Sequence, residues 1–421
     1  MTNIYIHIDA DAFFASVEQC LHRELRGKPI VTGRDGSVAV AMSYEAKALG
    51  VERAMPIHLI REEFPMVQMV ASDYFMYRIF SARMQRIIKQ YIPEITQSSI
   101  DECHGDISDD VQDFQEAKEL ALNIKQELEL KLGCTFSIGI SSSPLLAKMA
   151  SGIHKPSGLT IIDTQNNRDY VGYPIKKVNG LGTQLCKRLS GFGIVYIRDF
   201  IREYPRIRKN FSVVTDDIFY QLQGYPPLRN SKKEDQKSMN RARSFKVSFS
   251  RDEVYGQLVL NLESLLKKMR RQNMLAKTVH VSLGDIERKR VSSKIRLDTA
   301  SRDPDNIGFI AQTLFNKIYI NNKGYRYVSV TLSGLIKKDY LQIDLFGESI
   351  NSEKREGMYS AIDILDAKFG KPVIRLASTL TTPQSLSSHI NKEENIITYQ
   401  NPLLKGETFY RRVRYPYLGM I

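Results

Sequence analysis

Cysteine is scarce and scattered in this chain of 421 residues. The four cysteines are Cys20, Cys103, Cys134 and Cys186, and no two of them form a Cys-x-x-Cys pair. Closely spaced cysteine pairs are typical of zinc sites, and dense cysteine frameworks are typical of small secreted domains. The spacing therefore predicts reduced intracellular thiols and argues against a disulfide framework or a zinc site.

Long hydrophobic runs are also absent. No apolar run approaches the roughly 18–20 residues that a membrane span requires. The first segment, MTNIYIHIDADAFF, lacks the basic start and uniform apolar stretch of a signal peptide and carries two aspartates. Apolar residues make up 42% of the chain and charged residues 25%, which is ordinary globular composition. We therefore expect a cytoplasmic protein of roughly two to four domains with no membrane partner.

Acidic residues are in deficit. The chain has 47 Asp and Glu against 60 Lys and Arg, which gives a net charge of +13. Much of the excess falls between Lys237 and Arg296, where fifteen basic residues accompany five acidic ones. Such an imbalance favours a polyanionic partner, most simply nucleic acid, although a charge run is often only solvated surface.

The N-terminal region has the periodicity of an α/β layer. The order strand, helices, strand, helix, strand fits a ferredoxin-like layer with a helical insertion after the first strand. We expect strands over 4–8, 38–41, 97–107 and 135–140, and helices over 13–21, 44–49, 74–92, 111–133 and 144–151.

Two later regions differ in character. Glycine pairs at Gly180, Gly182 and at Gly191, Gly193 are typical of a helix-hairpin-helix, whose backbone amides approach phosphate closely. The polar stretch 230–240 is a candidate linker. Beyond it we expect a separate α+β domain with strands over 244–250, 278–283 and 327–332 and helices over 258–274 and 307–319.

Three acidic residues are the candidate catalytic groups. Asp9 ends the first strand, and Asp101-Glu102 lies in a later strand-like segment. Magnesium prefers hard oxygen ligands, and two ions bridged by phosphates need about three carboxylates on adjacent segments. Neighbouring residues on a regular strand face opposite ways, so Asp101 and Glu102 share a site only if the backbone turns between them. On spacing alone, merely solvated acids are the alternative.

Five sequence blocks together resemble the Y-family, lesion-bypass DNA polymerases. They are IHIDADAFFASVE, VAMSYEAKALGVERAMPI, SSIDECHGDI, FSIGISSSPLLAKMASGIHKPSGL and VNGLGTQLCKRL. The resemblance covers residues 1–350. The AKALGVERAMP wording and the long C-terminal extension resemble the UmuC-like branch, and KMASGIHKPSGL also resembles the DinB type.

The resemblance implies an α+β multidomain fold. This is a right-hand polymerase with a ferredoxin-like palm, small fingers, a helix-hairpin-helix thumb and an α+β little finger. The implied domains are the palm over 1–19 and 73–165, the fingers over 20–72, the thumb over 166–232, a linker over 233–240, the little finger over 241–350 and an extension over 351–421.

The resemblance also implies a two-metal active site. Asp9, Asp101, Glu102 and the Ala10 backbone carbonyl would hold two Mg²⁺ ions, which activate the primer 3′-hydroxyl and neutralise the triphosphate. Asp11 shares the strand face of Asp9, but the family does not use it as a principal ligand. We therefore expect a structural role for Asp11.

Aromatic and basic residues are expected to bind the nucleotide. Phe14 matches the steric gate of the family, a ring that leaves no room for a ribose 2′-hydroxyl, and Phe13 is expected to pack near the nucleotide. Without the resemblance, paired aromatics at a helix start are usually core. Tyr44 and Lys47, three apart on one helical face, and Lys155 match residues that contact the triphosphate.

A few positions depart from the family pattern. Lys47 replaces the commoner arginine, so a bidentate fork becomes a point charge. Ala41 stands where many relatives carry a threonine, and His104-Gly105 stands where bulkier residues are common, which should loosen the packing. We interpret these changes as tuning of activity. For His104 a packing role is favoured, with a pH-switching role as the alternative.

DNA contacts are expected in two domains. The thumb glycines would approach the minor-groove backbone, and basic residues of the little finger would grip phosphates without reading sequence. The candidates are Gly180, Gly182, Gly191 and Gly193 in the thumb and Arg241, Arg243 and Lys246 in the little finger.

Protein partners are expected at the C-terminal end. The segment Gln342-Ile343-Asp344-Leu345-Phe346 resembles the pentapeptide by which bacterial polymerases bind the sliding clamp, in which Gln342 hydrogen-bonds while Leu345 and Phe346 enter a pocket. The extension resembles one used for regulatory partners such as recombinase filaments or accessory subunits. A short helical appendage is the alternative.

We therefore expect a DNA-directed DNA polymerase that adds dNTPs to the 3′ end of primer–template DNA and copies damaged templates at low fidelity. Its setting would be a bacterial SOS-type damage response at the nucleoid. One alternative is a catalytically silent, damaged-DNA-binding relative that recruits repair partners, which the His104-Gly105 departure supports. A second is another palm enzyme such as a nucleotidyl cyclase, against which the basic C-terminal half argues.

Overall fold

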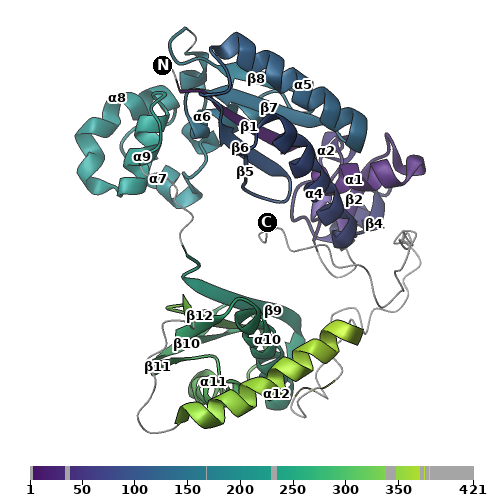
Figure 1. Ribbon diagram of the computed structural model, residues 1–421, viewed down its shortest axis with the longest axis vertical. Coiled ribbons are helices and arrows are strands. Elements are labelled where there is room, and N and C mark those ends of the chain that lie inside the picture. Colours follow the sequence, from purple (N-terminus) through teal and green to yellow (C-terminus); the bar gives the residue numbers. More distant parts are fainter. Residues whose placement is uncertain are drawn as a thin grey trace. The chain divides into compact units, whose positions relative to one another are not determined.

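The structure is a computed structural model that describes residues 3–33, 38–166, 168–228, 235–337 and 348–369, together with Ile374 and Thr379. These residues form two compact units, one before residue 229 and one after residue 234 (Figure 1). Each unit has its own sheet and its own hydrophobic core. No described helix is long and apolar enough to cross a membrane.

A five-stranded sheet forms the centre of the first unit. Its order is β5 (Thr96–Gln97), β6 (Glu102–Asp106), β1 (Tyr5–Ala10), β7 (Phe136–Ser141) and β8 (Leu159–Ile162). Helices α4 (Tyr74–Tyr91) and α5 (Phe114–Leu132) cover one face (Figure 1). Ile4, Ile6 and Ile8 alternate toward these helices and are buried with them. Because successive strand residues face opposite ways, His7 and Asp9 point to the other face.

Helix α6 (Pro144–Ser151) packs on that other face. Its start follows from local chemistry, because Ser143 Oγ accepts a hydrogen bond from Leu146 N and Pro144 occupies the first turn. The approach to β7 is so close that a Cβ on Gly139 would lie 2.0 Å from the Ala147 carbonyl oxygen. Glycine at this position therefore allows α6 to lie beside His7.

The sequence predicts most of these elements within a few residues. Asp113 caps the start of α5, and Gly133, with a φ of 72°, ends it as expected. The segment 97–107 differs, because it is not one strand. It divides into β5 and β6 with a bend between them, and Asp101 lies in that bend.

A smaller three-stranded layer carries the residues between α1 (Phe13–Leu21) and α4. Its order is β3 (Ala41–Met42), β2 (Ile30–Gly33) and β4 (Gln68–Ala71), with α2 (Tyr44–Ala48) and α3 (Ile57–Glu63) packed against it. The N-terminal end of α2 is set by Ser43, whose Oγ accepts from Ala46 N. This cap places Tyr44 and Lys47 near the end of β1.

Three helices complete the first unit: α7 (Thr183–Ser190), α8 (Ile197–Ile207) and α9 (Val213–Gln221). They enclose the fully buried Phe200 and Tyr204. Hydrogen bonds fix them to the start of α6, since Ser143 Oγ donates to the Gln221 carbonyl at 2.8 Å.

The second unit is an antiparallel sheet with helices on one face. The order is β11 (Arg290–Ser301), β10 (Met274–Asp285), β12 (Tyr325–Ser333) and β9 (Ser238–Ser248), with the short β13 (Ile336–Lys337) paired to β10. Helices α10 (Arg251–Arg271) and α11 (Pro304–Ile318) bury the alternating Val279, Val281, Val328 and Val330. Strand β9 begins at Ser238, so the last residues of the expected linker belong to the sheet. Strand β11 was not expected, because along it only Leu297 is buried.

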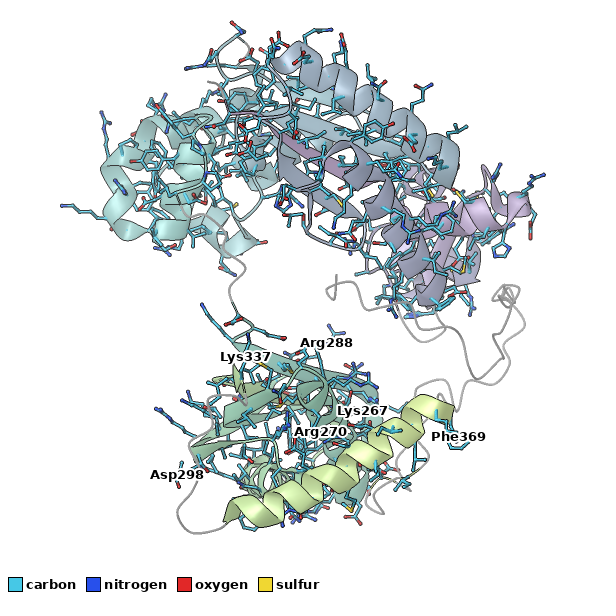
Figure 2. All side chains as sticks on the ribbon, viewed as in Figure 1. Lys267, Arg270, Arg288, Asp298, Lys337 and Phe369 are labelled. Carbon is cyan, nitrogen blue, oxygen red and sulfur yellow. The ribbon has the colours of Figure 1, made fainter. Side chains whose placement is uncertain are left out.

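Ion pairs join helix α12 (Glu348–Phe369) to α10. Arg270 donates to both carboxylate oxygens of Asp363 at 2.8 and 3.1 Å, and Lys267 Nζ lies 2.6 Å from Asp366. Figure 2 labels Lys267 and Arg270 beside α12. A cavity of about 480 Å³ lies between α10, α11 and α12. This part of the C-terminal extension is therefore a helical appendage of the second unit.

Candidate active site

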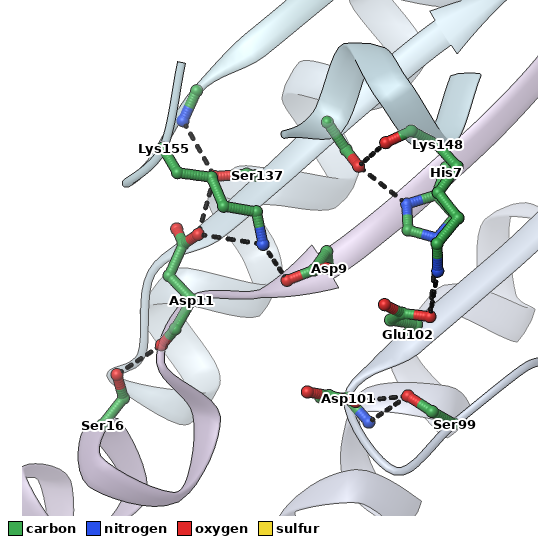
Figure 3. A network of polar contacts seen from close by, with 12 residues as sticks. His7, Asp9, Asp11, Ser16, Ser99, Asp101, Glu102, Ser137, Lys148 and Lys155 are labelled. Atoms are coloured by element: carbon green, nitrogen blue, oxygen red, sulfur yellow. Dashed lines mark hydrogen bonds and ion pairs between the residues drawn. The ribbon is translucent and has the colours of Figure 1, made fainter. Parts of the chain in front are cut away.

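The bend before β6 brings Asp101 and Glu102 to the same end of the sheet as Asp9. Asp9 and Glu102 are direct partners across β1 and β6, and Ala10 N donates to the Asp101 carbonyl at 2.9 Å. Ser99 stabilises the bend, because its hydroxyl donates to the Asp101 carboxylate and accepts from Asp101 N (Figure 3). The turn that the two neighbouring acids require is thus present.

Asp9 sits in an unfavourable environment for a charged carboxylate. Burial raises its pKa, and the charges of Glu102 and Asp101 add to the rise, while the Lys155 ammonium opposes it. Lys155 forms an ion pair with Asp9 (Figure 3). The charges of Glu102 and Asp101 are therefore close enough to Asp9 to oppose its ionisation.

A lysine and a histidine lie beside the same carboxylate oxygen of Glu102. The imidazole of His7 and the ammonium of Lys148 lower the pKa of Glu102 to about 2, against the effect of burial. Lys148 Nζ lies 2.6 Å from Glu102 Oε2, and His7 Nε2 lies 3.9 Å from the same oxygen, which is too long for a hydrogen bond. Ser151 Oγ donates to the Lys148 carbonyl and therefore accepts from His7 Nδ1, both at 2.9 Å.

The donor set suits a hard divalent cation. Carboxylates of Asp9, Asp101 and Glu102 and the Ala10 carbonyl are all oxygen ligands of the kind that Mg²⁺ prefers. Among the residues that the structure describes, no three acidic, histidine or cysteine groups converge around a single point. Asp9 and Glu102 are instead each paired with a lysine. The acids lie together with their charge balanced by ammonium groups that a cation could replace.

Asp11 has a different role from Asp9. Its side chain is fully buried, and it accepts hydrogen bonds from Ser137 Oγ at 2.8 Å, Ser157 N at 2.7 Å and Tyr44 Oη at 3.4 Å. These bonds join three separate segments around the end of β1. Figure 3 shows Asp11 with Ser137 at this position. The expected structural role for Asp11 agrees with this network.

Phe14 lies on a support of aromatic rings. It stacks on Tyr77 with ring centroids 4.2 Å apart and planes inclined by 12°, and Tyr74 meets it edge-on at 5.7 Å. Tyr77 is itself fixed, because its hydroxyl donates to the buried Glu18 at 2.5 Å. Phe13 is only 5% exposed and belongs to the core.

Basic residues gather beside the acids. The Lys47 ammonium lies 4.1 Å from the centroid of the Tyr44 ring. Burial lowers the pKa of Lys47, and the nearby charges of Lys155 and Arg53 act in the same direction. The structure therefore brings Tyr44, Lys47 and Lys155 together as expected and adds Arg53, which the sequence analysis missed.

The departures around His104 do not loosen the packing. A Cβ on Gly105 would lie 2.9 Å from Ile95 Cδ1, so that isoleucine fills the space. His104 Nδ1 hydrogen-bonds to Ser98 Oγ at 2.7 Å, and burial lowers the pKa of the ring. The packing role is the better description of His104.

The residues expected to contact DNA lie on several surfaces. Gly182 and Gly191 flank α7, while Gly180 and Gly193, with φ of 89° and 75°, form the exposed turns beside it. In the second unit, Arg241 and Lys246 are exposed, and Arg243 donates to Gln257 of α10 at 3.3 Å. Strand register pairs Arg243 with Val328 and Arg241 with Val330, so both arginines start on the face that α10 covers, and the structure favours other residues for phosphate contacts. The contacts expected of Lys246 and of the four glycines stay predictions.

The expected clamp-binding segment, Gln342 to Phe346 with Asp344 and Leu345 within it, lies outside the described residues.

His7, Lys148 and Arg53 are the residues of this site that sequence reasoning missed. His7 could have been found, because it precedes Asp9 by two positions and so shares its strand face. Lys148 and Ser151 lie three apart on α6, but nothing in the sequence shows that α6 crosses the sheet at His7.

Comparisons with known proteins agree with this geometry. Residues 8–152 match the impB/mucB/samB family, and residues 236–345 match the C-terminal domain of that family. The DNA polymerase IV of Pelotomaculum thermopropionicum is 30% identical over 389 residues, covering 89% of this chain and 94% of that protein. The DNA polymerase IV of Desulfatibacillum aliphaticivorans is 29% identical over 386 residues, covering 90% and 97%.

Solved structures with a similar fold are also DNA polymerases. The Y-family DNA polymerase chimera Dbh-Dpo4(243-245)-Dbh has a TM-score of 0.66 at 25% identity, covering 79% of this chain and 99% of that one. An insertion ternary complex of Dbh DNA polymerase has a TM-score of 0.55 at 25% identity, covering the same shares of the two chains. The UmuC-like branch stays a prediction. The chain belongs to the impB/mucB/samB family, the Y family of DNA polymerases.

Proposed function

We propose that this protein is a translesion DNA polymerase that extends a primer 3′ end with dNTPs on damaged templates. The observation that carries the proposal is the meeting of Asp9, Asp101 and Glu102 at one end of the β1–β6 pair, beside an aromatic ring at Phe14. Relatives named DNA polymerase IV support the same reading. A catalytically silent relative is not favoured, because all three acids are present and adjacent.

The metal requirement that we propose is two Mg²⁺ ions, held by Asp9, Asp101, Glu102 and the Ala10 carbonyl. Bound there, they would lower the pKa of the primer hydroxyl and neutralise the triphosphate and leaving pyrophosphate. Lys155 and Lys148 balance the acids in the structure described here, and both ammonium groups are on side chains long enough to turn toward an incoming phosphate.

The nucleotide would bind between the acids and the cluster of Tyr44, Lys47, Lys155 and Arg53. The positive charges of Lys47, Lys155 and Arg53 match the triphosphate. Tyr44 is oriented by its hydrogen bond to Asp11. Phe14, supported by Tyr77, would face the sugar and exclude a 2′-hydroxyl.

For DNA, we propose the face of the second sheet on which no described helix packs. Strand register places Lys294 beside His280 and Arg296 beside Thr278 on that face. On the same face the Arg290 guanidinium lies 4.1 Å from the centroid of the Tyr327 ring. The paired residues there are basic, small or hydroxylated, and none is acidic. Phosphate contacts of this kind bind DNA at any sequence.

The proposal also includes the domain division stated from the sequence and a cytoplasmic setting at the nucleoid. It further includes a sliding-clamp contact through Gln342, Leu345 and Phe346. They rest on the resemblance to the Y family. The extension beyond α12 would serve recombinase or accessory partners.

Primer extension tests the polymerase assignment. Wild-type protein with Mg²⁺, four dNTPs and a primer on a template with an abasic site is expected to extend past the lesion. Asp101→Asn and Glu102→Gln should each lower kcat by about 10³-fold or more while DNA binding, read by fluorescence anisotropy, persists. Asp109→Asn, an exposed acid beyond β6, is the matched control and should keep full activity. No extension by the wild type would refute the proposal.

A further inference from the structure

Two cysteines from distant parts of the sequence lie in contact in the first unit. Cys20 is in the last turn of α1, and Cys134 lies between Gly133, which ends α5, and β7. Their Sγ atoms are 3.3 Å apart. A disulfide bond is about 2.05 Å long, so a displacement of about 1 Å separates contact from bonding.

The surroundings make the two thiols chemically unequal. Cys20 is partly exposed, whereas Cys134 is only 3% exposed. The Cys134 thiol beside it lowers the pKa of Cys20, and the charge of Arg26 acts in the same direction against burial. Hydrogen bonding with Cys20, together with burial, raises the pKa of Cys134. A partly exposed thiol of lowered pKa in contact with a buried thiol of raised pKa is the arrangement of an attacking and a resolving cysteine.

The other two cysteines lack this arrangement. Cys103 is fully buried, and burial raises its pKa to about 12. Cys186, in α7, donates to the Leu181 carbonyl at 3.3 Å. All four cysteines lie within the described residues, and only Cys20 and Cys134 touch one another there.

We propose that Cys20 and Cys134 are a peroxide-sensitive dithiol that closes to a reversible disulfide. The Cys20 thiolate attacks one oxygen of hydrogen peroxide and becomes a sulfenic acid, while the O–O bond breaks and the released hydroxide takes up a proton. The Cys134 sulfur then attacks the sulfenic sulfur, gives up its proton, and displaces the hydroxyl as water. Two thiols lose two electrons, one peroxide gains two, and two waters form.

The disulfide bond would link α1 covalently to the segment before β7, near the active site. Asp11 N donates to the Thr135 carbonyl at 3.0 Å, so the segment after Cys134 already holds the end of β1. Helix α1 carries Phe14 at its other end. The two cysteines are 114 positions apart, and a crosslink across so long a loop removes much of the freedom of the unfolded chain. The oxidised protein should therefore melt at a higher temperature than the reduced one.

Thiol mapping of the full-length protein tests the proposal. Reduced protein is treated with a small excess of hydrogen peroxide, quenched, alkylated under denaturing conditions and digested. We expect two of the four thiols to escape alkylation, a crosslinked peptide containing Cys20 and Cys134, and full recovery after dithiothreitol. Four alkylated thiols, or a crosslink between other cysteines, would overturn the proposal.

Single substitutions distinguish the attacking role of Cys20 from the resolving role of Cys134. Cys134→Ala should leave a Cys20 sulfenic acid that dimedone traps, Cys20→Ser should abolish both trap and crosslink, and Cys186→Ser should behave as the wild type. Because Cys20 is partly exposed and Cys134 is buried, Cys20→Ser is the safer variant should Cys134→Ala fold poorly. A melting temperature unchanged or lowered by oxidation would refute the fastening of α1.

Discussion

Phe14 stacks on Tyr77 almost face to face, with ring centroids 4.2 Å apart. Tyr77 is anchored in turn by its hydroxyl, which donates to the buried Glu18, and Glu18 also accepts from Asp73 N at 3.4 Å. The ring proposed to meet the sugar is therefore held by a neighbour that cannot easily move. This rigidity is what a steric filter requires, because a mobile ring would yield to an additional hydroxyl.

Phe14→Ala should admit ribonucleotides. Removing the ring opens the space that a 2′-hydroxyl needs, so the preference for dNTPs over NTPs in kcat/KM should fall at least about tenfold, which is about 1.4 kcal/mol of discrimination. Single-nucleotide insertion with matched dNTP and NTP measures it. Phe309→Ala is the matched control, because it removes an exposed ring of α11 in the second unit. Unchanged sugar selectivity in Phe14→Ala would reject Phe14 as the gate.

Asp9 and Glu102 should affect stability in opposite directions when no divalent cation is present. The pKa of Asp9 is raised in the folded protein, so its charge is unfavourable at neutral pH, and Asp9→Asn should raise the melting temperature there. The gain should vanish as the pH falls below the ordinary value of 3.8, where the carboxyl is protonated in both states. Thermal melts with EDTA at pH 7 and pH 3 measure this.

The charge of Glu102 should affect stability in the opposite direction to that of Asp9. Its pKa is lowered from 4.5 to about 2, so its charge stabilises the fold above pH 4.5, and the stabilisation disappears as the pH falls toward 2. Glu102→Gln should cost about 1–2 kcal/mol at pH 7 after solvent screening and about half as much at pH 3. If Asp9→Asn and Glu102→Gln shifted stability the same way, the described charge balance would be wrong.

The sequence predicts the acidic residues of the site better than the basic residues that contact them. Asp101 and Glu102 are adjacent in sequence, and the family resemblance supplied the bend between them that spacing alone did not. His7 and Lys148 lie beside Glu102 only because α6 packs across the five-stranded sheet. No local sequence pattern predicts how a helix packs across a sheet. Strand β11 was missed for a similar reason. No described helix packs on one face of its sheet, and only Leu297 along the strand is buried, so the strand lacks a clear apolar alternation.

Gly139 is the point at which that crossing can be tested. Its missing side chain lets α6 approach β7, and a Cβ would lie 2.0 Å from the Ala147 oxygen and 2.3 Å from Ser151 N. Gly139→Ala should destabilise the protein by about 3 kcal/mol or more and lower activity, because α6 carries Lys148 and Ser151. Urea denaturation with primer extension measures both effects.

Gly308 provides the matched control for that substitution. It lies within α11, and a Cβ there would meet nothing within 4 Å. Gly308→Ala should stabilise the second unit by about 0.5–1 kcal/mol, because alanine favours the helix. Equal effects of the two substitutions would show that α6 does not touch β7 as described.

The basic face of the second sheet should govern the salt dependence of DNA binding. Lys294 and Arg296 are exposed on the face where no described helix packs, whereas Arg243 donates to Gln257 on the face covered by α10. Each phosphate contact contributes about 0.9 to the slope of log K against log salt. Lys294→Ala and Arg296→Ala should therefore each reduce the slope by about 1 on any sequence, while Arg243→Ala should leave it nearly unchanged. Anisotropy titrations with primer–template DNA from low to physiological salt give the slopes. A larger loss for Arg243→Ala than for the other two would place the DNA on the opposite side of the sheet.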